Sequence, residues 1–253
     1  MTYTKINYGL DAPPICYGMF AIGFFGLIVA ILSPLFVSDL LLLGVEAIAC
    51  LMAAYGVGMG IYMVWSSRIG KLRTCETLMN EIGRIRPWKG DEIVLDVGCG
   101  RGLLLIGAAK RLTSGKAYGI DLWKGEDQAD NSPEAPLENA KRAGVADRVE
   151  IKTGDARQIP FAPEAFDVVV SHWVIHNIEE ENDRSIALQE IWRVLKPDGV
   201  LALADISFVK AYLDQIKGWN SKSISFYDGG NEAKLMGFLS GGTFRPQYLI
   251  VKK

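Results

Sequence analysis

A glycine-rich turn after an apolar strand constrains the fold of this chain more than any other segment. Residues 94–102 are VLDVGCGRG, so an apolar, β-branched run meets Asp96 and is followed by three alternate glycines. Because glycine lacks a Cβ atom, the backbone there can turn tightly and approach a ligand closely. The apolar residues 103–112 come next and predict a helix whose first N–H groups are unpaired. We therefore expect a strand–turn–helix unit with a ligand at the turn.

The spacing of the glycines separates two kinds of nucleotide site. A dinucleotide site requires G-x-G-x-x-G, whereas the third glycine here is Gly102, followed by Leu103. The spacing acid-x-G-x-G-x-G, carried by Asp96, Gly98, Gly100 and Gly102, resembles the first motif of class I S-adenosylmethionine-dependent methyltransferases. A nicotinamide oxidoreductase remains an alternative that this spacing disfavours.

Four later segments occur in the order that this family shows. They are residues 117–122, 149–156, 166–171 and 191–201. The resemblance covers roughly residues 75–206 and is closest in character to the branch that methylates quinones and related small molecules. It implies an α/β fold, a Rossmann-like doubly wound methyltransferase sheet of seven strands, with the last two near residues 223–227 and 248–251.

The resemblance also implies which residues bind the cofactor, S-adenosyl-L-methionine, which would leave as S-adenosyl-L-homocysteine. These residues are Asp96, Gly98, Cys99, Gly100, Gly102, Asp121, Leu122, Asp155, Ala156 and Ser171. The glycine turn would run beneath the methionine and ribose portion. Asp121 would accept hydrogen bonds from both ribose hydroxyls, and Asp155 would receive the adenine amine. For Asp155 the alternative is a purely structural role in capping its turn.

The two histidines of the chain follow the fourth expected strand, within residues 171–177. Ligands of open α/β sheets bind beyond the carboxyl ends of the strands, and a histidine with a pKa near neutrality suits a general base. A helix beginning here would place His172 and His176 on one face. Family resemblance puts His176 at an acceptor-pocket position, so three roles stay open for it: a general base, a pocket wall or a purely structural residue.

Two long apolar runs precede the sheet. Residues 15–32 carry no charge, and residues 40–65 carry only Glu46. Each run reaches the roughly 20 residues that cross a bilayer as a helix. We predict a two-helix transmembrane hairpin in residues 1–66, with spans at about 15–35 and 40–65. The alternative is a buried hairpin of a soluble protein. A G-x-x-x-G step from Gly56 to Gly60 predicts close helix packing, either within the hairpin or between the protomers of a homodimer.

Basic residues predict the topology of this hairpin. Arg68, Lys71 and Arg73 follow the second run, and Lys5 precedes the first. The positive-inside rule then gives a multi-pass protein of the cell membrane, with two spans and its catalytic domain in the cytoplasm. Residues 67–90 predict an amphipathic linker helix, which either lies on an anionic leaflet or caps the sheet. The predicted methyltransferase domain follows at residues 91–253.

Composition excludes several other classes. The net charge is −2, so we expect no nucleic-acid partner. The four cysteines have no metal-ligand spacing, and two histidines are too few for a multi-histidine centre, so we expect no metal. An acidic, turn-rich insertion at residues 123–133 predicts either a lid over the acceptor site or a solvated loop.

Together these features predict a membrane-anchored methyltransferase whose partners are the lipid bilayer and a small acceptor. The anchor favours a hydrophobic or membrane-associated acceptor, such as a quinone or other isoprenoid, a lipid or a small thiol. The alternative is a membrane-tethered protein that binds S-adenosylmethionine without catalysis.

Overall fold

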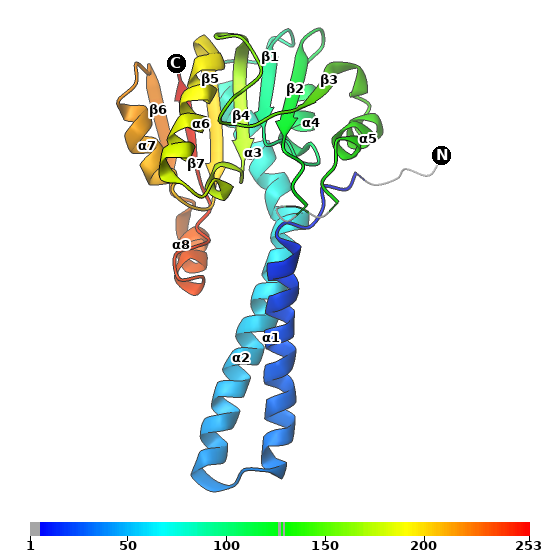
Figure 1. Ribbon diagram of the computed structural model, residues 1–253, viewed down its shortest axis with the longest axis vertical. Helices are drawn as coiled ribbons and strands as arrows, with labels where there is room; N and C mark the ends of the chain where they lie inside the picture. The colour runs from blue at the N-terminus through cyan, green and yellow to red at the C-terminus, as the bar shows by residue number, and fades with distance from the viewer. Residues whose placement is uncertain (1–5, 126–127, 129) are drawn as a thin grey trace. The chain divides into compact units, whose positions relative to one another are not determined.

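The protein divides into two compact units. The computed structural model describes residues 6–125, 128 and 130–253 (Figure 1). Of these, residues 6–7, 74–123 and 131–253 form one unit, which we call the sheet unit. Residues 8–73, 124–125, 128 and 130 form the other, which we call the hairpin unit.

A seven-stranded sheet forms the centre of the sheet unit, in the order β3-β2-β1-β4-β5-β7-β6. Its strands are β1 (Ile93–Val97), β2 (Lys116–Asp121), β3 (Val149–Thr153), β4 (Phe166–His172), β5 (Leu195–Asp205), β6 (Ser223–Tyr227) and β7 (Gln247–Lys252). The first five strands are parallel to one another, whereas β7 runs antiparallel to both β5 and β6. The predicted seven-stranded, Rossmann-like sheet is therefore confirmed.

Helices connect these strands. They are α3 (Lys71–Ile85), α4 (Leu103–Ala109), α5 (Glu134–Ala143), α6 (Glu181–Val194), α7 (Val209–Lys217) and α8 (Gly230–Leu239), with 3-10 turns η3 (Ala146–Arg148) and η4 (Ile175–Asn177). In Figure 1, α6 and α7 lie in front of the sheet and α3 lies behind it. Parallel strands covered in this way are buried on both faces, and β1, β4 and the part of β5 from Gly199 to Asp205 are accordingly almost fully buried.

The helix α3 packs tightly on the sheet unit through its second half. Leu78, Met79 and Ile82 are completely buried. A Cβ atom on Gly107 of α4 would lie 2.6 Å from the Cys75 Sγ atom, so only glycine lets the two helices approach this closely. The expectation that this segment caps the sheet is supported by this packing.

Two sequence expectations differ in detail from the structure. The helix predicted over residues 103–112 ends at Ala109, because the N–H groups of Arg111 and Leu112 bond to carbonyls three residues back and tighten the chain into a turn. The apolar stripe predicted for the linker helix is buried only in part, since Ile69 and Leu72 are 43% and 42% exposed.

The hairpin unit consists of α1 (Pro13–Leu32), the 3-10 turn η1 (Ser33–Leu35), α2 (Asp39–Trp65) and the π-helical η2 (Ser66–Gly70), which leads into α3. Among the described residues, two helical stretches are long and apolar enough to cross a membrane, Pro13–Leu35 and Asp39–Ile85. Only 17% of the most apolar window of each is buried. A core helix of a soluble protein would bury far more of its apolar surface.

Glycines hold α1 and α2 together. A Cβ atom on Gly56 would lie 2.4 Å from the backbone nitrogen of Gly23, and one on Gly26 would lie 2.7 Å from the carbonyl oxygen of Ala49. A Cβ atom on Gly60 would meet the ring of Phe20 at 2.9 Å. The G-x-x-x-G step therefore faces the other helix of its own hairpin. Of the two alternatives left open by the sequence, this supports packing within the hairpin.

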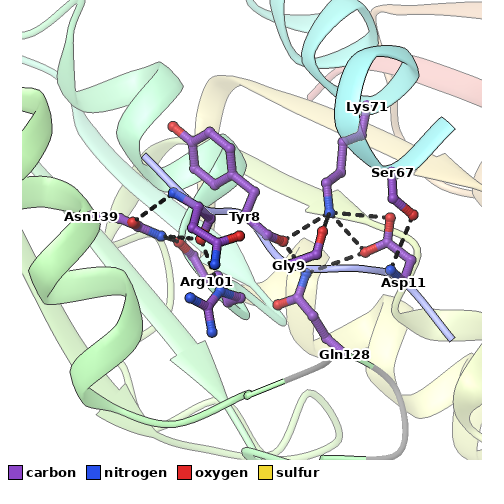
Figure 2. A network of polar contacts seen from close by, with 9 residues as sticks. Tyr8, Gly9, Asp11, Ser67, Lys71, Arg101, Gln128 and Asn139 are labelled. Atoms are coloured by element: carbon purple, nitrogen blue, oxygen red, sulfur yellow. Dashed lines mark hydrogen bonds and ion pairs between the residues drawn. The ribbon is translucent and has the colours of Figure 1, made fainter. Parts of the chain in front are cut away.

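A buried lysine secures the segment before α1 within the hairpin unit (Figure 2). The side chain of Lys71 is 3% exposed, and its ammonium donates to the carbonyls of Tyr8 and Gly9 at 2.8 and 2.9 Å and to the Asp11 carboxylate at 3.0 Å. Asp11 in turn accepts from Gln128 at 3.3 Å. The three protons of the ammonium thus match three acceptor groups, which offsets the cost of burying its charge.

Candidate functional site

The glycine loop lies at the carboxyl end of β1, where parallel α/β sheets bind ligands. Gly98, Gly100 and Gly102 have φ angles of 71°, 47° and 85°, in the left-handed region that favours glycine. A Cβ atom on Gly98 would lie 2.2 Å from the Val174 side chain. Between the glycines, Cys99 is buried, and burial raises the pKa of its thiol well above the usual value. The loop therefore offers backbone, and not a reactive thiol, to a ligand.

Asp96 shapes this loop from below. Its carboxylate is 2% exposed and accepts a hydrogen bond of 2.8 Å from the backbone N–H of Leu105, in the first turn of α4. Burial raises the pKa of Asp96, the bond from Leu105 lowers it and the nearby charge of Asp121 raises it, which together place it at about 8. These contacts support a role for Asp96 in orienting the loop.

Asp96→Asn is expected to change how stability depends on pH. The raised pKa means that the folded state favours the neutral carboxyl, so its contribution is complete below about pH 4 and is lost as the pH rises through about 8. This loss amounts to at most about 1.4 kcal/mol per pH unit. The asparagine variant has no carboxyl to ionise and therefore does not lose stability in this way. Its free energy of unfolding, measured by denaturant titration, should rise relative to that of the wild type between pH 5 and 8. Parallel pH profiles of the two proteins would contradict the assignment.

Asp121 ends β2 and holds the glycine loop from the other side. It accepts hydrogen bonds from the backbone N–H of Gly100 at 2.8 Å and of Trp123 at 2.7 Å, and from the Asn131 side chain at 3.2 Å. The next residue, Leu122, is 46% exposed. Asp121 is thus fixed at the carboxyl edge of the sheet, with its charge shared among three donors.

The predicted insertion contributes to this arrangement at both ends. Its first residue, Trp123, adopts a φ of 59° and donates from its indole to Thr153 at 2.9 Å. Residues 126, 127 and 129 lie outside the described part of the chain, so its interpretation as a lid stays a prediction. The helix α5 begins directly after the insertion, at Glu134.

A shallow cavity of about 530 Å³ opens at the carboxyl end of β3. It is lined by Thr153, Gly154, Asp155, Gln158, Ile159, Pro160, Phe161 and Ala162. The Asp155 carboxylate lies at its rim in an ion pair of 2.6 Å with Arg157, which also pairs with Asp183 at 2.6 Å. Ala156 is buried beside it. An adenine amine would therefore share Asp155 with Arg157, a partner that the sequence did not suggest.

A second polar network covers the glycine loop within the sheet unit (Figure 2). The carbonyl of Asn7 accepts from the Arg101 guanidinium and from the Asn139 amide, both at 2.8 Å. Asn139 is 1% exposed and also donates to the Arg101 carbonyl at 3.0 Å. Asn7 and Asn139 are 132 residues apart, so no local pattern pointed to this contact.

No α-helix begins at the two histidines, so the condition under which they would share a helix face is not met. His172 is the last residue of β4, Trp173 adopts a φ of 58°, and only the short 3-10 turn η4 follows. The strand pairing of His172 with Ala204 of β5 keeps the chain extended to this point, and the left-handed Trp173 then reverses it. The His172 ring stacks on Trp173 with centroids 4.7 Å apart. His172 and His176 therefore belong to different elements and share no helix face.

His176 instead forms a pair with Asp205, the last residue of β5. Its Nδ1 atom lies 2.5 Å from the Asp205 Oδ1 atom, and its backbone N–H donates to the other oxygen at 3.0 Å. Asp205 is fully buried and also accepts from the Ile206 N–H and the Tyr212 hydroxyl. A carboxylate bound to Nδ1 fixes the tautomer in which Nε2 carries the lone pair of a base.

Sequence reasoning missed Asp205, although an acidic residue at the carboxyl end of the fifth strand was a signal of the same kind as Asp121. The remaining predicted cofactor residue, Ser171, is 1% exposed, and its hydroxyl donates to the Val97 carbonyl at 2.9 Å. This bond joins β4 to β1 beneath the loop. Within the described residues, no group of three or more potential metal ligands occurs.

A family comparison gives this arrangement its class. Residues 95–203 match the family model described as a methyltransferase domain. The matched segment extends from β1 into β5 and includes the glycine loop, Asp121 and His176. The sheet unit thus has a Rossmann-like fold, and the part of it from β1 into β5 is similar to a methyltransferase domain.

Individual relatives align over this domain. Demethylmenaquinone methyltransferase of Lactobacillus johnsonii is 31% identical over 152 residues, which are 59% of this chain and 56% of the relative. Methyltransferase GfsG of Streptomyces halstedii is 34% identical over 123 residues, 49% of this chain and 40% of the relative. The chain spans about half the length of the curated relatives it matches.

Solved structures share the fold at low sequence identity. Geranyl diphosphate C-methyltransferase from Streptomyces coelicolor, in complex with S-adenosyl-L-homocysteine, gives a TM-score of 0.54 at 15% identity, covering 71% of this chain and 78% of that one. The [4+2]-cyclase SpnF gives 0.52 at 17% identity, covering 70% and 80%. Because a cyclase shares this fold, the function has to be argued from the site.

Proposed function

We propose that the protein is an S-adenosylmethionine-dependent methyltransferase. The single observation that carries the proposal is the loop of three left-handed glycines, closed on either side by Asp96 and Asp121, at the carboxyl edge of the sheet. The fit to the cofactor rests on two features. Only glycine fits at position 98, because a Cβ atom there would clash with Val174, so the loop presents bare backbone to a ligand. Asp121 presents carboxylate oxygens where a ribose diol would lie.

When bound, S-adenosylmethionine supplies a methyl group that its positive sulfur already activates. The chain must then align an acceptor and, where the acceptor carries a proton, remove it. We assign proton removal to His176, which Asp205 holds by Nδ1 so that Nε2 accepts the proton. Asp205 acts through His176 as a positioning residue. A hydroxyl or a thiol acceptor suits this pair, since each must lose a proton when it is methylated.

We further propose that the hairpin anchors the protein in the cell membrane with its methyltransferase domain in the cytoplasm. The low burial of both apolar helices supports this placement. Arg68 and Arg73 are exposed after the second span, as the positive-inside rule requires, whereas the Lys71 charge is offset by Asp11. The acceptor is then a hydrophobic or membrane-associated molecule of the quinone, isoprenoid, lipid or small-thiol class. The demethylmenaquinone and geranyl diphosphate methyltransferases among its relatives support a prenylated acceptor.

Calorimetry on the full chain in detergent tests cofactor choice. We expect S-adenosylmethionine to bind and NAD not to bind. Asp121→Asn should weaken S-adenosylmethionine binding about 10- to 100-fold, because it removes a charged acceptor worth roughly 1.5–3 kcal/mol. As a control, Asp147→Asn alters an exposed carboxylate before β3 and should leave the affinity unchanged. Equal affinity of the Asp121→Asn and Asp147→Asn proteins would contradict the assignment.

The acceptor class is tested by incubating the protein with methyl-labelled cofactor and either a membrane lipid extract or soluble metabolites. Label in the lipid extract supports the proposal, and label only in strongly polar soluble acceptors contradicts it. Tight cofactor binding with no methyl transfer to either pool would favour a tethered binding protein without catalysis.

A further inference from the structure

The helix α8 presents large apolar side chains to solvent. Phe238 is 83% exposed and Leu235 is 53% exposed, three residues apart on one face of the helix. The opposite face, which includes Ala233 and Met236, is buried. Exposed apolar groups that lie together mark an interaction site more often than scattered ones do.

Strand register places α8 at the same edge of the sheet as the candidate site. The helix connects β6 to β7, and the first residue of β7, Gln247, pairs with Asp205 at the carboxyl end of β5. Figure 1 shows α8 projecting from this edge. The loop after α8 lies close to the histidine region, since the ring of Phe244 packs edge-on against Trp173 with centroids 5.5 Å apart.

Covalent geometry limits how far this edge can lie from the first apolar helix. Asn7 is hydrogen-bonded to Arg101 and Asn139 at the glycine loop, and α1 begins at Pro13. A chain of that length reaches at most about 20 Å. The limit holds for every orientation of the two units. A domain of this size is on the order of 40 Å across, so the connection from Asn7 to Pro13 is short compared with the domain that it joins to α1.

We propose that the exposed face of α8, formed by Leu235 and Phe238, inserts into the interfacial region of the bilayer that holds the hairpin. The inference rests on the membrane anchor proposed above. Burying a phenylalanine or leucine side chain away from water is favourable by about tenfold or more in a partition constant. An apolar contact beside the candidate site also gives a membrane-dissolved acceptor a short path toward His176.

The test uses the full chain in liposomes that contain lipids brominated on their acyl chains, which quench tryptophan fluorescence on contact. Phe238→Trp introduces a reporter on α8, and Asp147→Trp introduces a control at the opposite edge of the sheet, where Asp147 is 76% exposed. Emission of the six native tryptophans is subtracted with the wild-type protein. We expect most of the emission added by Phe238→Trp to be quenched and that added by Asp147→Trp to be retained.

Flotation of the same liposomes separates the possible failures. A protein that floats with the liposomes but leaves the Phe238→Trp emission unquenched overturns the α8 contact and leaves the anchor intact. The α8 contact is also overturned, with the anchor intact, if the Phe238→Trp side chain is shielded from water only at high protein density. In that case a second copy of the chain, and not the bilayer, would cover this face. A protein that does not float overturns the anchor and this contact together. Cofactor affinity, measured on the same sample, should be unaffected by either substitution.

Discussion

Replacing Gly98 by alanine is expected to lower the affinity for S-adenosylmethionine about a hundredfold. The backbone at Gly98 has a φ of 71°, which costs an alanine roughly 1–2 kcal/mol. The added Cβ atom would also lie 2.2 Å from Val174, and overpacking of this kind costs roughly 1–3 kcal/mol. Both costs are relieved by moving the loop out of the shape that cradles the cofactor. Calorimetry with the full chain measures the change.

Two further variants separate the clash from the backbone cost. Gly144 has a φ of 72° with open space around its Cβ position, so Gly144→Ala carries the backbone cost alone. It should reduce stability slightly and leave cofactor affinity unchanged. Adding Val174→Ala to Gly98→Ala removes the two nearest contact atoms and should restore part of the affinity. Wild-type affinity of the Gly98→Ala protein would show that the loop does not bind the cofactor.

His176→Gln should reduce turnover by a factor of about 10² to 10⁴ while cofactor affinity stays at the wild-type value. A general base contributes a factor of this size, and glutamine keeps the polar volume but does not take up the proton. Turnover is measured with labelled cofactor and the acceptor pool that the screen identifies. His172→Gln is the matched control, because its ring stacks on Trp173 and it does not pair with Asp205. A large loss in His172→Gln with full activity in His176→Gln would reverse the assignment.

Asp205→Asn distinguishes a positioning residue from a merely structural one. Loss of the carboxylate removes the partner that fixes His176 through Nδ1. The acid limb of the pH–rate profile should therefore shift along with the fall in turnover. A residue that only supports the fold would lower stability without moving that limb.

The glycine loop was predictable because its information is local. The alternation of Gly98, Gly100 and Gly102 requires only neighbouring residues, and all three adopt the left-handed backbone that the spacing implies. The strands and the two apolar helices were predictable for the same reason. Each depends on the pattern of a continuous run of the chain.

The misplaced histidines show where local patterns fail. The spacing of His172 and His176 suits a helix, but pairing with β5 keeps His172 in a strand and a left-handed Trp173 follows. The partner of His176 lies 29 residues away on another strand. Competition between strand pairing and helix formation is decided by contacts that periodicity does not record.

Sequence by itself determined the chemistry of the turn, the order of the strands along the chain and the presence of two apolar helices, since these follow from neighbours joined by covalent bonds. Tertiary structure alone decided that Asp205 meets His176, that Asn7 closes on the glycine loop and that α8 carries its apolar face at the same edge. Those contacts join distant parts of the chain, and only the register and packing of the folded sheet bring them together.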